Sequence, residues 1–403
     1  MSSLLFTSLL PPSFFLLGLL NNSSYVIMLA GAKEISEGGV ALVFICNVLP
    51  SFICKLTGPI WFHKVKYEVR IKACMILMSL SFIIVALSND YRVKLLGVAA
   101  ASLQSGLGEA SILALASRYQ RTRECLTAWS SGTGAAGVFG FAFVWVFNSA
   151  LGWSFPVMLC AANVLTGLFG VVYFYMLPKQ DGGEDDEDEG GDGGEEDHDG
   201  LLEDFPRKEI STEGKSQDKS QLLSISDRLK FTRRLYKYMI PLFLVYFAEY
   251  AMQSGTWAAI GFPVEDEDAR KSFYQNANWV YQAGVFVSRS SGNIWHASMF
   301  ALWLMPVIQC GMLVLFYLIA IYQFLYSNVL LLGCFFVGLL GGSVYVNAFN
   351  RISKDIEKEN VELALSTASV ADSCGIMLSD VAGLFLQACV YKKFGIEGAA
   401  VSC

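Results

Sequence analysis

Apolar runs long enough to cross a lipid bilayer recur along the whole chain. A helix needs about 20 predominantly apolar residues to cross the hydrocarbon core, and eleven stretches meet or approach that length. They fall at residues 13–31, 39–62, 71–88, 93–117, 127–149, 153–177, 237–262, 273–289, 296–322, 325–349 and 362–391. The pattern predicts an all-α polytopic membrane protein with six spans before a long polar interruption and five after it.

Two of these stretches need a decision. The first contains Ala30-Gly31-Ala32, which a signal peptidase could accept, but no basic residue precedes Lys33 and "NNSS" interrupts the apolar run from Asn21. We therefore expect the first span to be retained. The stretch at 273–289 begins with polar residues, so it suits an amphipathic helix that either lines a cavity or lies on the membrane surface.

Composition supports a membrane protein and reveals an unusual loop. The 403 residues are 54% hydrophobic and only 16% charged, too apolar for a soluble protein of this length. The net charge is −7, yet residues 181–204 hold 14 acidic residues and no Lys or Arg. The rest of the chain is therefore net positive.

Basic residues near the span ends predict the orientation, because cytosolic loops are enriched in Lys and Arg. One side carries Lys64, Lys66, Arg70, Lys72, Arg118, Arg121 and Arg123, and the other side of the same half carries only Lys33, Arg92 and Lys94. The N-terminus and the 178–235 loop should thus face the cytosol. An odd number of spans then places the C-terminal "KKFGIEGAAVSC" on the opposite, lumenal or outer side.

The polar interruption divides the chain into three parts. Residues 178–235 lack apolar periodicity and are rich in Gly, Asp, Glu and Ser, which predicts a disordered cytosolic linker. It separates a six-helix lobe, residues 1–177, from a five-helix lobe, residues 236–403. Two acidic dileucine patterns that clathrin adaptors read lie in it, although a loop this acidic produces such matches by chance. Their key residues are Asp197, Leu201 and Leu202, and Asp218, Leu222 and Leu223.

Six spans, a long cytosolic loop and further spans form the organisation of the major facilitator superfamily, in which two lobes rock around a central cavity. The first helix of each three-helix repeat lines that cavity, so spans 1, 4, 7 and 10 should hold the buried polar groups. They do hold the richest clusters: Asn21, Asn22 and Tyr25 in span 1; Glu109 in span 4; Tyr246, Glu249, Tyr250 and Gln253 in span 7; Tyr345 and Asn347 in span 10. We expect these residues to bind a small-molecule substrate or protons.

Glu109 and Glu249 are the centre of this hypothesis. A carboxylate is tolerated in a membrane span mainly where it faces a bundle interior or a wet cavity, and a desolvated carboxyl there can take up and release protons. We expect both side chains to face one shared chamber. The alternative is that each glutamate only ties helices together by hydrogen bonds.

Other polar and small residues leave alternatives open. Arg289 could bind an anionic substrate or mark the cytosolic end of its span. Asp372 and Asp380 could line a second polar path or pair with Ser373 and Ser379, and Lys55 could reach the interface and has no assigned role. "WSSGTGAAGVFG", from Trp129, predicts close helix packing or a flexible gate. Cysteines in apolar runs are interpreted as helix-packing residues without disulfides or metal: Cys46, Cys54, Cys74, Cys160, Cys310, Cys334, Cys374 and Cys389.

Six segments in order from span 1 to span 10 form one characteristic set: "LLGLLNNSSYVIMLAGAKEI", "SGLGEASILALASRY", "WSSGTGAAG", "VYFAEY", "VYQAGVFVSRSS" and "GLLGGSVYVNAFNRI". Together they closely resemble the battenin family of membrane proteins. The resemblance implies a multi-pass protein of lysosomes and late endosomes, distantly similar to facilitator transporters and associated with glycerophosphodiester export, lysosomal pH and basic amino acid homeostasis. Two departures stand out. The loop after span 2, "GPIWFHKVKYEVRIK", lacks the Asp of the facilitator gating motif, and "AVSC" is not a prenylation site.

Two functional classes follow. The first is a lysosomal exporter of a small polar metabolite, with possible proton coupling. The second is a non-transporting scaffold or trafficking regulator that acts through the cytosolic loop, in which case deletion of residues 181–226 would abolish function. An enzyme is disfavoured because the only histidines are His63, His198 and His296, near loops or span ends. We expect the bilayer as a partner, no nucleic acid and no cofactor.

Overall fold

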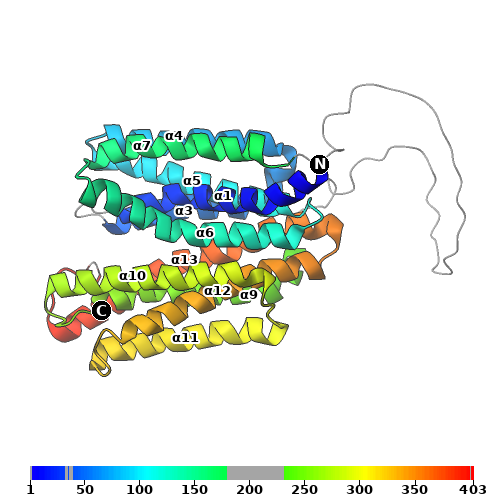
Figure 1. The fold of residues 1–403 in the computed structure, drawn as a ribbon. Coiled ribbons are helices and arrows are strands. Elements are labelled where there is room, and N and C mark those ends of the chain that lie inside the picture. Colours follow the sequence, from blue (N-terminus) through cyan, green and yellow to red (C-terminus); the bar gives the residue numbers. More distant parts are fainter. Residues whose placement is uncertain (1, 32–34, 36–39, 179–230, 400) are drawn as a thin grey trace, which may run out of the picture.

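A computed structural model describes residues 2–31, 35, 40–178, 231–399 and 401–403. Long α-helices occupy nearly all of these ranges (Figure 1). They are α1 (Ser2–Ala30), α3 (Val40–Trp61), α4 (Tyr67–Leu87), α5 (Tyr91–Ala116), α6 (Thr122–Val144), α7 (Phe155–Val171), α9 (Tyr236–Ala251), α10 (Glu267–Ser290), α11 (Met299–Tyr322), α12 (Leu330–Asp355) and α13 (Lys358–Phe394). Each lies over one of the apolar stretches that predicted a span. The sorting motifs and most of the predicted linker lie outside the described residues.

Eight of these helices are long and apolar enough to cross a membrane, namely α1, α4, α5, α6, α7, α11, α12 and α13. The all-helical, multi-pass architecture is therefore confirmed. Within its described residues α3 contains a shorter apolar helical segment, Ile45–Gly58; α9 has only 16 residues, and α10 is less apolar than the other helices. Eleven crossings thus remain a prediction for this part of the chain.

Local sequence signals fix several helix ends. Helices suit the bilayer because every backbone group bonds within its own segment. The side chain of Asp90 accepts a hydrogen bond from the Arg92 N–H at the start of α5, and Ser298 does the same for the Ala301 N–H at the start of α11. Such side-chain acceptors satisfy N–H groups that have no partner inside the helix. At its other end α13 stops at Gly395, whose φ of 65° suits a residue without a Cβ.

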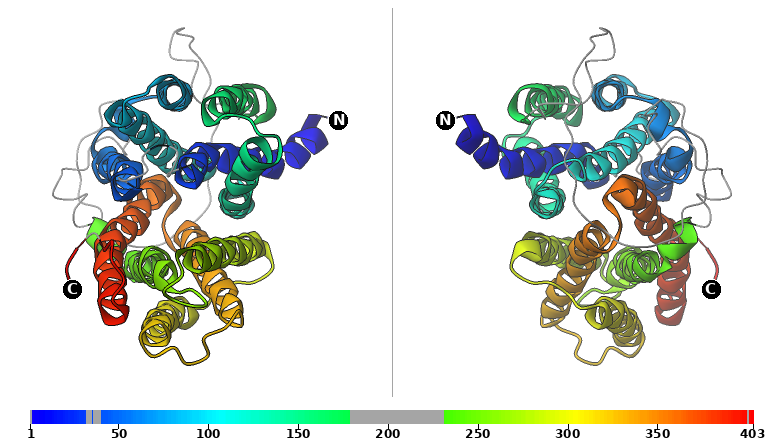
Figure 2. Two further views of the ribbon diagram at one scale, coloured as in Figure 1. Left: turned by 90° about the vertical axis from the view of Figure 1, so that its left-hand side faces the viewer. Right: turned by 90° about the vertical axis from the view of Figure 1, so that its right-hand side faces the viewer.

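The helices form two groups that face each other across the molecule, as the end-on views in Figure 2 show. We call α1 to α7 the N-lobe and α9 to α13 the C-lobe. Helix α13 packs against α3 and α5 of the N-lobe, and α10 and α12 pack against α6. The amphipathic α10 therefore lies inside the bundle, in contact with α12 along its length (Figure 1), and not on the membrane surface.

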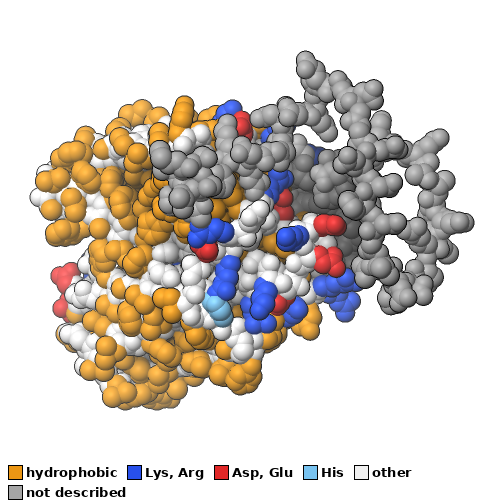
Figure 3. All heavy atoms as spheres, turned by 45° about the vertical axis from the view of Figure 1, so that its right-hand side comes forward, with side chains coloured by type: hydrophobic (Ala, Val, Ile, Leu, Met, Phe, Trp, Pro, Cys, Tyr) orange, Lys and Arg blue, Asp and Glu red, His pale blue; other side chains and the backbone are white. Residues whose placement is uncertain are grey.

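The two ends of the bundle differ in charge. Lys and Arg side chains gather at the end of the bundle where α9 begins (Figure 1, Figure 3). Exposed Lys64, Lys66 and Arg118 lie on connections at this end, whereas Arg70 is buried and its guanidinium stacks on the rings of Phe62 and Tyr67. The N-terminus also lies at this end, and the C-terminus lies at the other (Figure 1). This arrangement agrees with a cytosolic N-terminus.

Two cysteines differ from their interpretation as packing residues. Cys389 of α13 forms a disulfide with Cys403, because the chain turns back after Gly395 and runs alongside the helix end. Lys392 Nζ donates a hydrogen bond to the Cys403 carbonyl at 2.9 Å and supports that turn. Cys160 is exposed on α7, where it cannot pack between helices. The sequence could not predict the bridge because its second cysteine lies beyond the apolar run.

Candidate functional site

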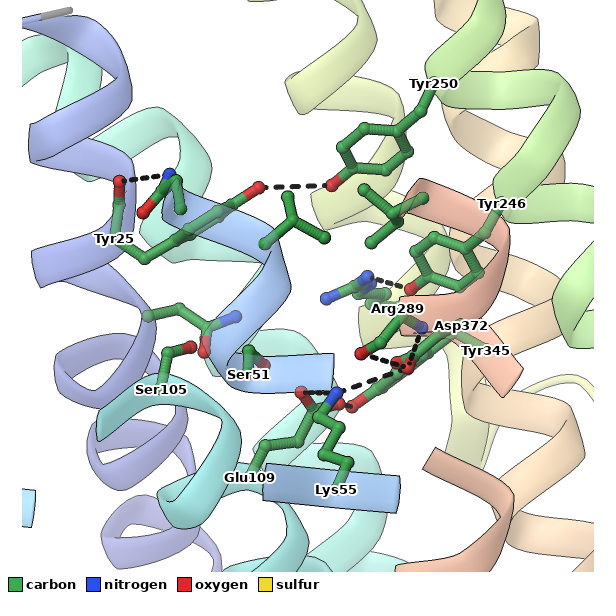
Figure 4. A pocket seen from close by; sticks show the side chains of 15 residues that line it. Tyr25, Ser51, Lys55, Ser105, Glu109, Tyr246, Tyr250, Arg289, Tyr345 and Asp372 are labelled. Atoms are coloured by element: carbon green, nitrogen blue, oxygen red, sulfur yellow. Dashed lines mark hydrogen bonds and ion pairs between the residues drawn. The ribbon is translucent and has the colours of Figure 1, made fainter. Parts of the chain in front are cut away.

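A polar pocket lies between the two lobes (Figure 4). Helices α1, α3 and α5 of the N-lobe and α9, α10, α12 and α13 of the C-lobe contribute to its wall. Spans 1, 4, 7 and 10 were predicted to line such a cavity, and all four do. The predicted site residues that line it are Asn22, Tyr25, Glu109, Tyr246, Tyr250, Arg289 and Tyr345.

Lys55 is the most strongly paired group in the pocket. It is 2% exposed, and its Nζ lies 2.6 Å from Glu109 Oε2 and 3.2 Å from Asp372 Oδ1. The prediction that Lys55 reaches the membrane interface is wrong, because its ammonium group points into the protein between two carboxylates (Figure 4). A buried charge requires such partners.

Arg289 occupies the pocket with no carboxylate in ion-pair contact among the described residues. Its guanidinium donates hydrogen bonds at 2.6 Å to Thr133 Oγ1 of α6 and to Tyr246 OH of α9. The cation also lies 4.2 Å from the ring centroid of Tyr345, and its Nε is buried without a hydrogen-bond partner. Of the two interpretations of Arg289, this position favours contact with a substrate over a marker of the span end.

Phenol groups complete the wall. Tyr25 OH of α1 and Tyr250 OH of α9 lie 3.5 Å apart across the lobes. Tyr345 OH donates to Glu109 Oε1 at 2.8 Å and accepts from Trp129 Nε1 at 3.3 Å. These side chains place hydrogen-bond donors and acceptors along the wall of the pocket.

Glu249 is not part of the pocket wall. It is 2% exposed inside the C-lobe, where Tyr281 OH of α10 donates a hydrogen bond to Oε1 and Oε2 lies against Gly341 of α12. Oε2 has no hydrogen-bond partner in the described structure. The expectation that Glu109 and Glu249 face one chamber is therefore wrong, and a role of Glu249 in proton binding stays a prediction.

Three other predicted residues also lie away from the pocket. Asn21 packs α1 on α5, where it donates to the Ser105 carbonyl and accepts from Gln104. Asn347 Oδ1 accepts from the Ala297 N–H at 2.8 Å, near the start of α11. Gln253 Nε2 is buried in a π-helical turn after α9 and has no hydrogen-bond partner among the described residues. Their identification as substrate-contacting residues stays untested.

Sequence reasoning missed the contribution of α3 and α13. Asn47, Ser51 and Lys55 line the pocket from α3, and Asp372 and Ser373 from α13. The α3 residues recur every four positions in an otherwise apolar run, which places them on one helical face, so this signal could have found them. Asp372 also pairs locally, as one interpretation held, because Oδ1 accepts from the Ser373 N–H at 2.5 Å and from its hydroxyl at 3.1 Å.

Comparison with known proteins agrees with this architecture. A protein-family model described as "CLN3 protein" matches residues 12–392. The chain belongs to the CLN3 protein family. Within that family it is 31% identical to battenin of Canis lupus familiaris, over 93% of this chain and 89% of battenin, and 33% identical to protein btn1 of Aspergillus fumigatus, over 93% and 86%. The resemblance to battenins is confirmed.

Solved structures support the fold of this CLN3 family member. The human organic anion transporter MFSD10 superimposes with a TM-score of 0.59 at 14% identity, covering 96% of this chain and 97% of that one. Its identity is low, so the likeness shows the fold alone. The major-facilitator-like architecture is confirmed, and together with the family it supports a transporter-like membrane protein.

The described residues contain no group of three or more His, Cys, Asp or Glu side chains arranged to hold a metal ion. The charged groups of the pocket instead contact one another, hydroxyl groups and aromatic rings.

Proposed function

We propose that this protein carries a small anionic metabolite of the glycerophosphodiester class out of lysosomes and late endosomes by alternating access. The observation that carries the proposal is the pairing of charges in the pocket. Lys55 contacts both carboxylates, Glu109 and Asp372, so Arg289 is left with hydroxyl groups and an aromatic ring. A guanidinium in this setting is an attractive contact for an anion.

The chemistry of a phosphodiester fits this arrangement. Such a group carries one negative charge and two terminal oxygens, which a planar guanidinium can bind through two parallel hydrogen bonds. The amides of Asn22 and Asn47 and the hydroxyls of Ser51 and Tyr25 line the same pocket and would suit the hydroxyl groups of glycerol. The aromatic wall would exclude solutes that carry bulky charged groups.

Two relationships support the location and the substrate class. Membership of the CLN3 protein family agrees with a lysosomal setting and with support of lysosomal pH and basic amino acid homeostasis. The structurally similar MFSD10 is described as an organic anion transporter, which is consistent with an anion site in a fold of this kind. The two dileucine motifs would direct the protein to lysosomes through clathrin adaptors.

The proposal is tested by transport in vesicles. Full-length protein is reconstituted in liposomes loaded with labelled glycerophosphoglycerol, which joins two neutral glycerol units by one phosphodiester, and efflux is measured against diglycerol, which lacks the phosphate. Arg289→Gln should slow phosphodiester efflux about tenfold or more, because charge-assisted hydrogen bonds contribute roughly 1.5–3 kcal/mol. Arg289→Lys should recover only part of the rate, since Lys cannot form the bidentate contact.

Arg92→Gln is the matched control, because Arg92 lies exposed at the start of α5, away from the pocket. It should export the phosphodiester at the wild-type rate. Equal efflux by wild type and Arg289→Gln, or equal efflux of glycerophosphoglycerol and diglycerol, would contradict the proposed anion site.

A further inference from the structure

A buried lysine connects the two lobes at the pocket. Lys55 and Glu109 both belong to the N-lobe, whereas Asp372 belongs to α13 of the C-lobe. All three residues are buried, with 2% of Lys55, 9% of Glu109 and 4% of Asp372 exposed, and Figure 4 shows the ammonium group between the two carboxylates. If the lobes separate here, the contact of Lys55 with Asp372 must break, while its contact with Glu109 can persist.

The charges of this cluster do not balance. One ammonium group serves two carboxylates, and an unpaired charge away from water is strongly destabilising. Two carboxylates that share a site hold a proton between them more readily than either would alone. A proton on one of them would leave a balanced pair of Lys55 with the other.

Hydrogen bonding distinguishes the two carboxylates. Glu109 has a donor at each oxygen: Lys55 at Oε2 and Tyr345 OH at Oε1. The donors that the described residues offer to Asp372 are Lys55 Nζ and the N–H and hydroxyl of Ser373, and all three reach Oδ1. Oδ2 is therefore the oxygen with room for a proton, and Lys55 lies closer to Glu109 than to Asp372.

The other ionisable groups around Asp372 do not replace Lys55. The helices packed against α13 present Lys55 from α3, Glu109 from α5, Tyr246 from α9 and Tyr345 from α12, and Arg289 of α10 lines the same pocket. Arg289 bonds to Thr133 and Tyr246 and makes no ion pair with Asp372 among the described residues. Asp380 lies two turns further along α13 and does not line the pocket.

We infer that Asp372 is the group whose protonation drives the transport cycle, and that Lys55 is the switch that senses it. This inference rests on the proposed function. A proton taken from the acidic lumen binds Asp372 Oδ2, the α3–α13 ion pair is lost, and Lys55 stays with Glu109. The lobes can then separate. When the site opens to the neutral cytosol, Asp372 releases the proton, the ion pair forms again and the lobes return.

The first experiment measures proton coupling as the ratio of two efflux rates, one from acidic and one from neutral vesicles. Glycerophosphoglycerol efflux from proteoliposomes is compared with an acidic and with a neutral interior. Wild type should export faster from the acidic vesicles, and Asp372→Asn should make the two rates equal, because the amide keeps the shape of the side chain but cannot titrate. Asp380→Asn, a second aspartate on the same helix, is the control and should keep the wild-type ratio.

The second experiment needs no transport. Spin labels introduced by genetic-code expansion at exposed Val69 of the N-lobe and exposed Ile294 of the C-lobe report the distance between the lobes by double electron–electron resonance. Val69 lies at the start of α4 and Ile294 lies after α10, so both are at the end of the bundle that carries the N-terminus (Figure 1). Acidification should lengthen this distance in wild type. In Asp372→Asn and Lys55→Gln the distance distribution should no longer change with pH.

Asp372→Glu covers the case in which Asp372→Asn does not fold. This variant keeps a titrating carboxyl in an altered position, so its pH response should persist with a shifted midpoint. The inference is overturned if Asp372→Asn responds to pH like wild type, or if Asp372→Glu has the wild-type midpoint. Absence of phosphodiester efflux in wild type would refute the proposed function, whereas the distance measurement would still test Asp372 and Lys55.

Discussion

The contacts within a lobe differ in kind from the contacts between lobes. Within the N-lobe, α1 and α6 touch backbone to backbone: a Cβ on Gly132 would lie 1.9 Å from the Phe15 carbonyl oxygen, and one on Gly18 would lie 2.5 Å from that of Trp129. In the C-lobe, a Cβ on Gly338 of α12 would lie 2.2 Å from the Tyr281 carbonyl oxygen of α10. Of the two interpretations of the glycine-rich segment, this favours close packing.

Between the lobes, polar side chains form many of the contacts. Lys55 reaches Asp372 at the pocket. At the end of the bundle that carries the N-terminus (Figure 1), Glu362 of α13 accepts from Tyr67 OH and pairs with Arg118 at 3.3 Å. These bonds can break one at a time without repacking a helix.

The difference indicates which parts move. Small residues that allow close backbone approach hold membrane helices together by van der Waals contact, so each lobe should behave as a rigid body. Ion pairs and hydrogen bonds along a polar seam suit an interface that opens and closes. Glu249 lies within a lobe and Glu109 lies at the seam, and their roles should differ accordingly.

The largest effect is expected from a change within a lobe. Gly132→Val would push α1 away from α6, because the nearest atom is backbone and cannot rotate aside. Overpacking of this kind typically costs about 1–3 kcal/mol or more, so we expect a lower melting temperature in detergent and poor recovery of folded protein. Gly167→Val is the control, since nothing lies within 4 Å of a Cβ there. Equal melting temperatures for the two variants would contradict rigid α1–α6 packing.

A smaller effect on stability is expected from Glu249→Leu, and this variant should distinguish the role of Glu249 from that of Glu109. Glu249→Leu leaves the buried Tyr281 hydroxyl without its acceptor, which costs about 1–3 kcal/mol. We expect a lower melting temperature but the wild-type ratio of efflux from acidic and neutral vesicles. Tyr281→Phe removes the same bond from the other side and should be destabilising as well. Loss of the acid response at unchanged stability would instead make Glu249 a proton-binding residue, as its sequence pattern predicted.

The smallest effect on stability is expected at the end of the bundle that carries the N-terminus. Arg118→Ala removes a half-exposed ion pair, and such pairs contribute no more than about 1 kcal/mol, so the melting temperature should hardly change. Hydrogen–deuterium exchange at the start of α13 should nevertheless rise, because among the described residues Glu362 would keep Tyr67 alone as a side-chain partner. Arg121→Ala, which breaks a pair with Glu124 inside the N-lobe, should leave exchange in α13 unchanged. Unchanged hydrogen–deuterium exchange at the start of α13 in Arg118→Ala would show that this pair does not hold the lobes together.

Hydropathy was sufficient to predict the helices, because apolar length is the dominant requirement of a bilayer. It could not predict how each helix is rotated about its axis. Tyr246, Glu249 and Tyr250 share one broad face of α9, yet three positions along a helix leave an offset of about 60°. That offset places the two tyrosines at the pocket and Glu249 inside the C-lobe. Hydropathy also could not predict that the Lys55 side chain is buried, because its partner Asp372 lies 317 positions away along the chain.

The bridge between Cys389 and Cys403 bears on which side of the membrane the end of α13 faces. Cytosolic glutathione and thioredoxin keep exposed thiols reduced, whereas secretory and endolysosomal compartments permit oxidation. The bridge at the end of α13 is therefore chemically compatible with the prediction that this end faces the lumenal or outer side. Any protein that recognises the end of α13 would therefore meet a helix whose Cys389 is tied covalently to Cys403.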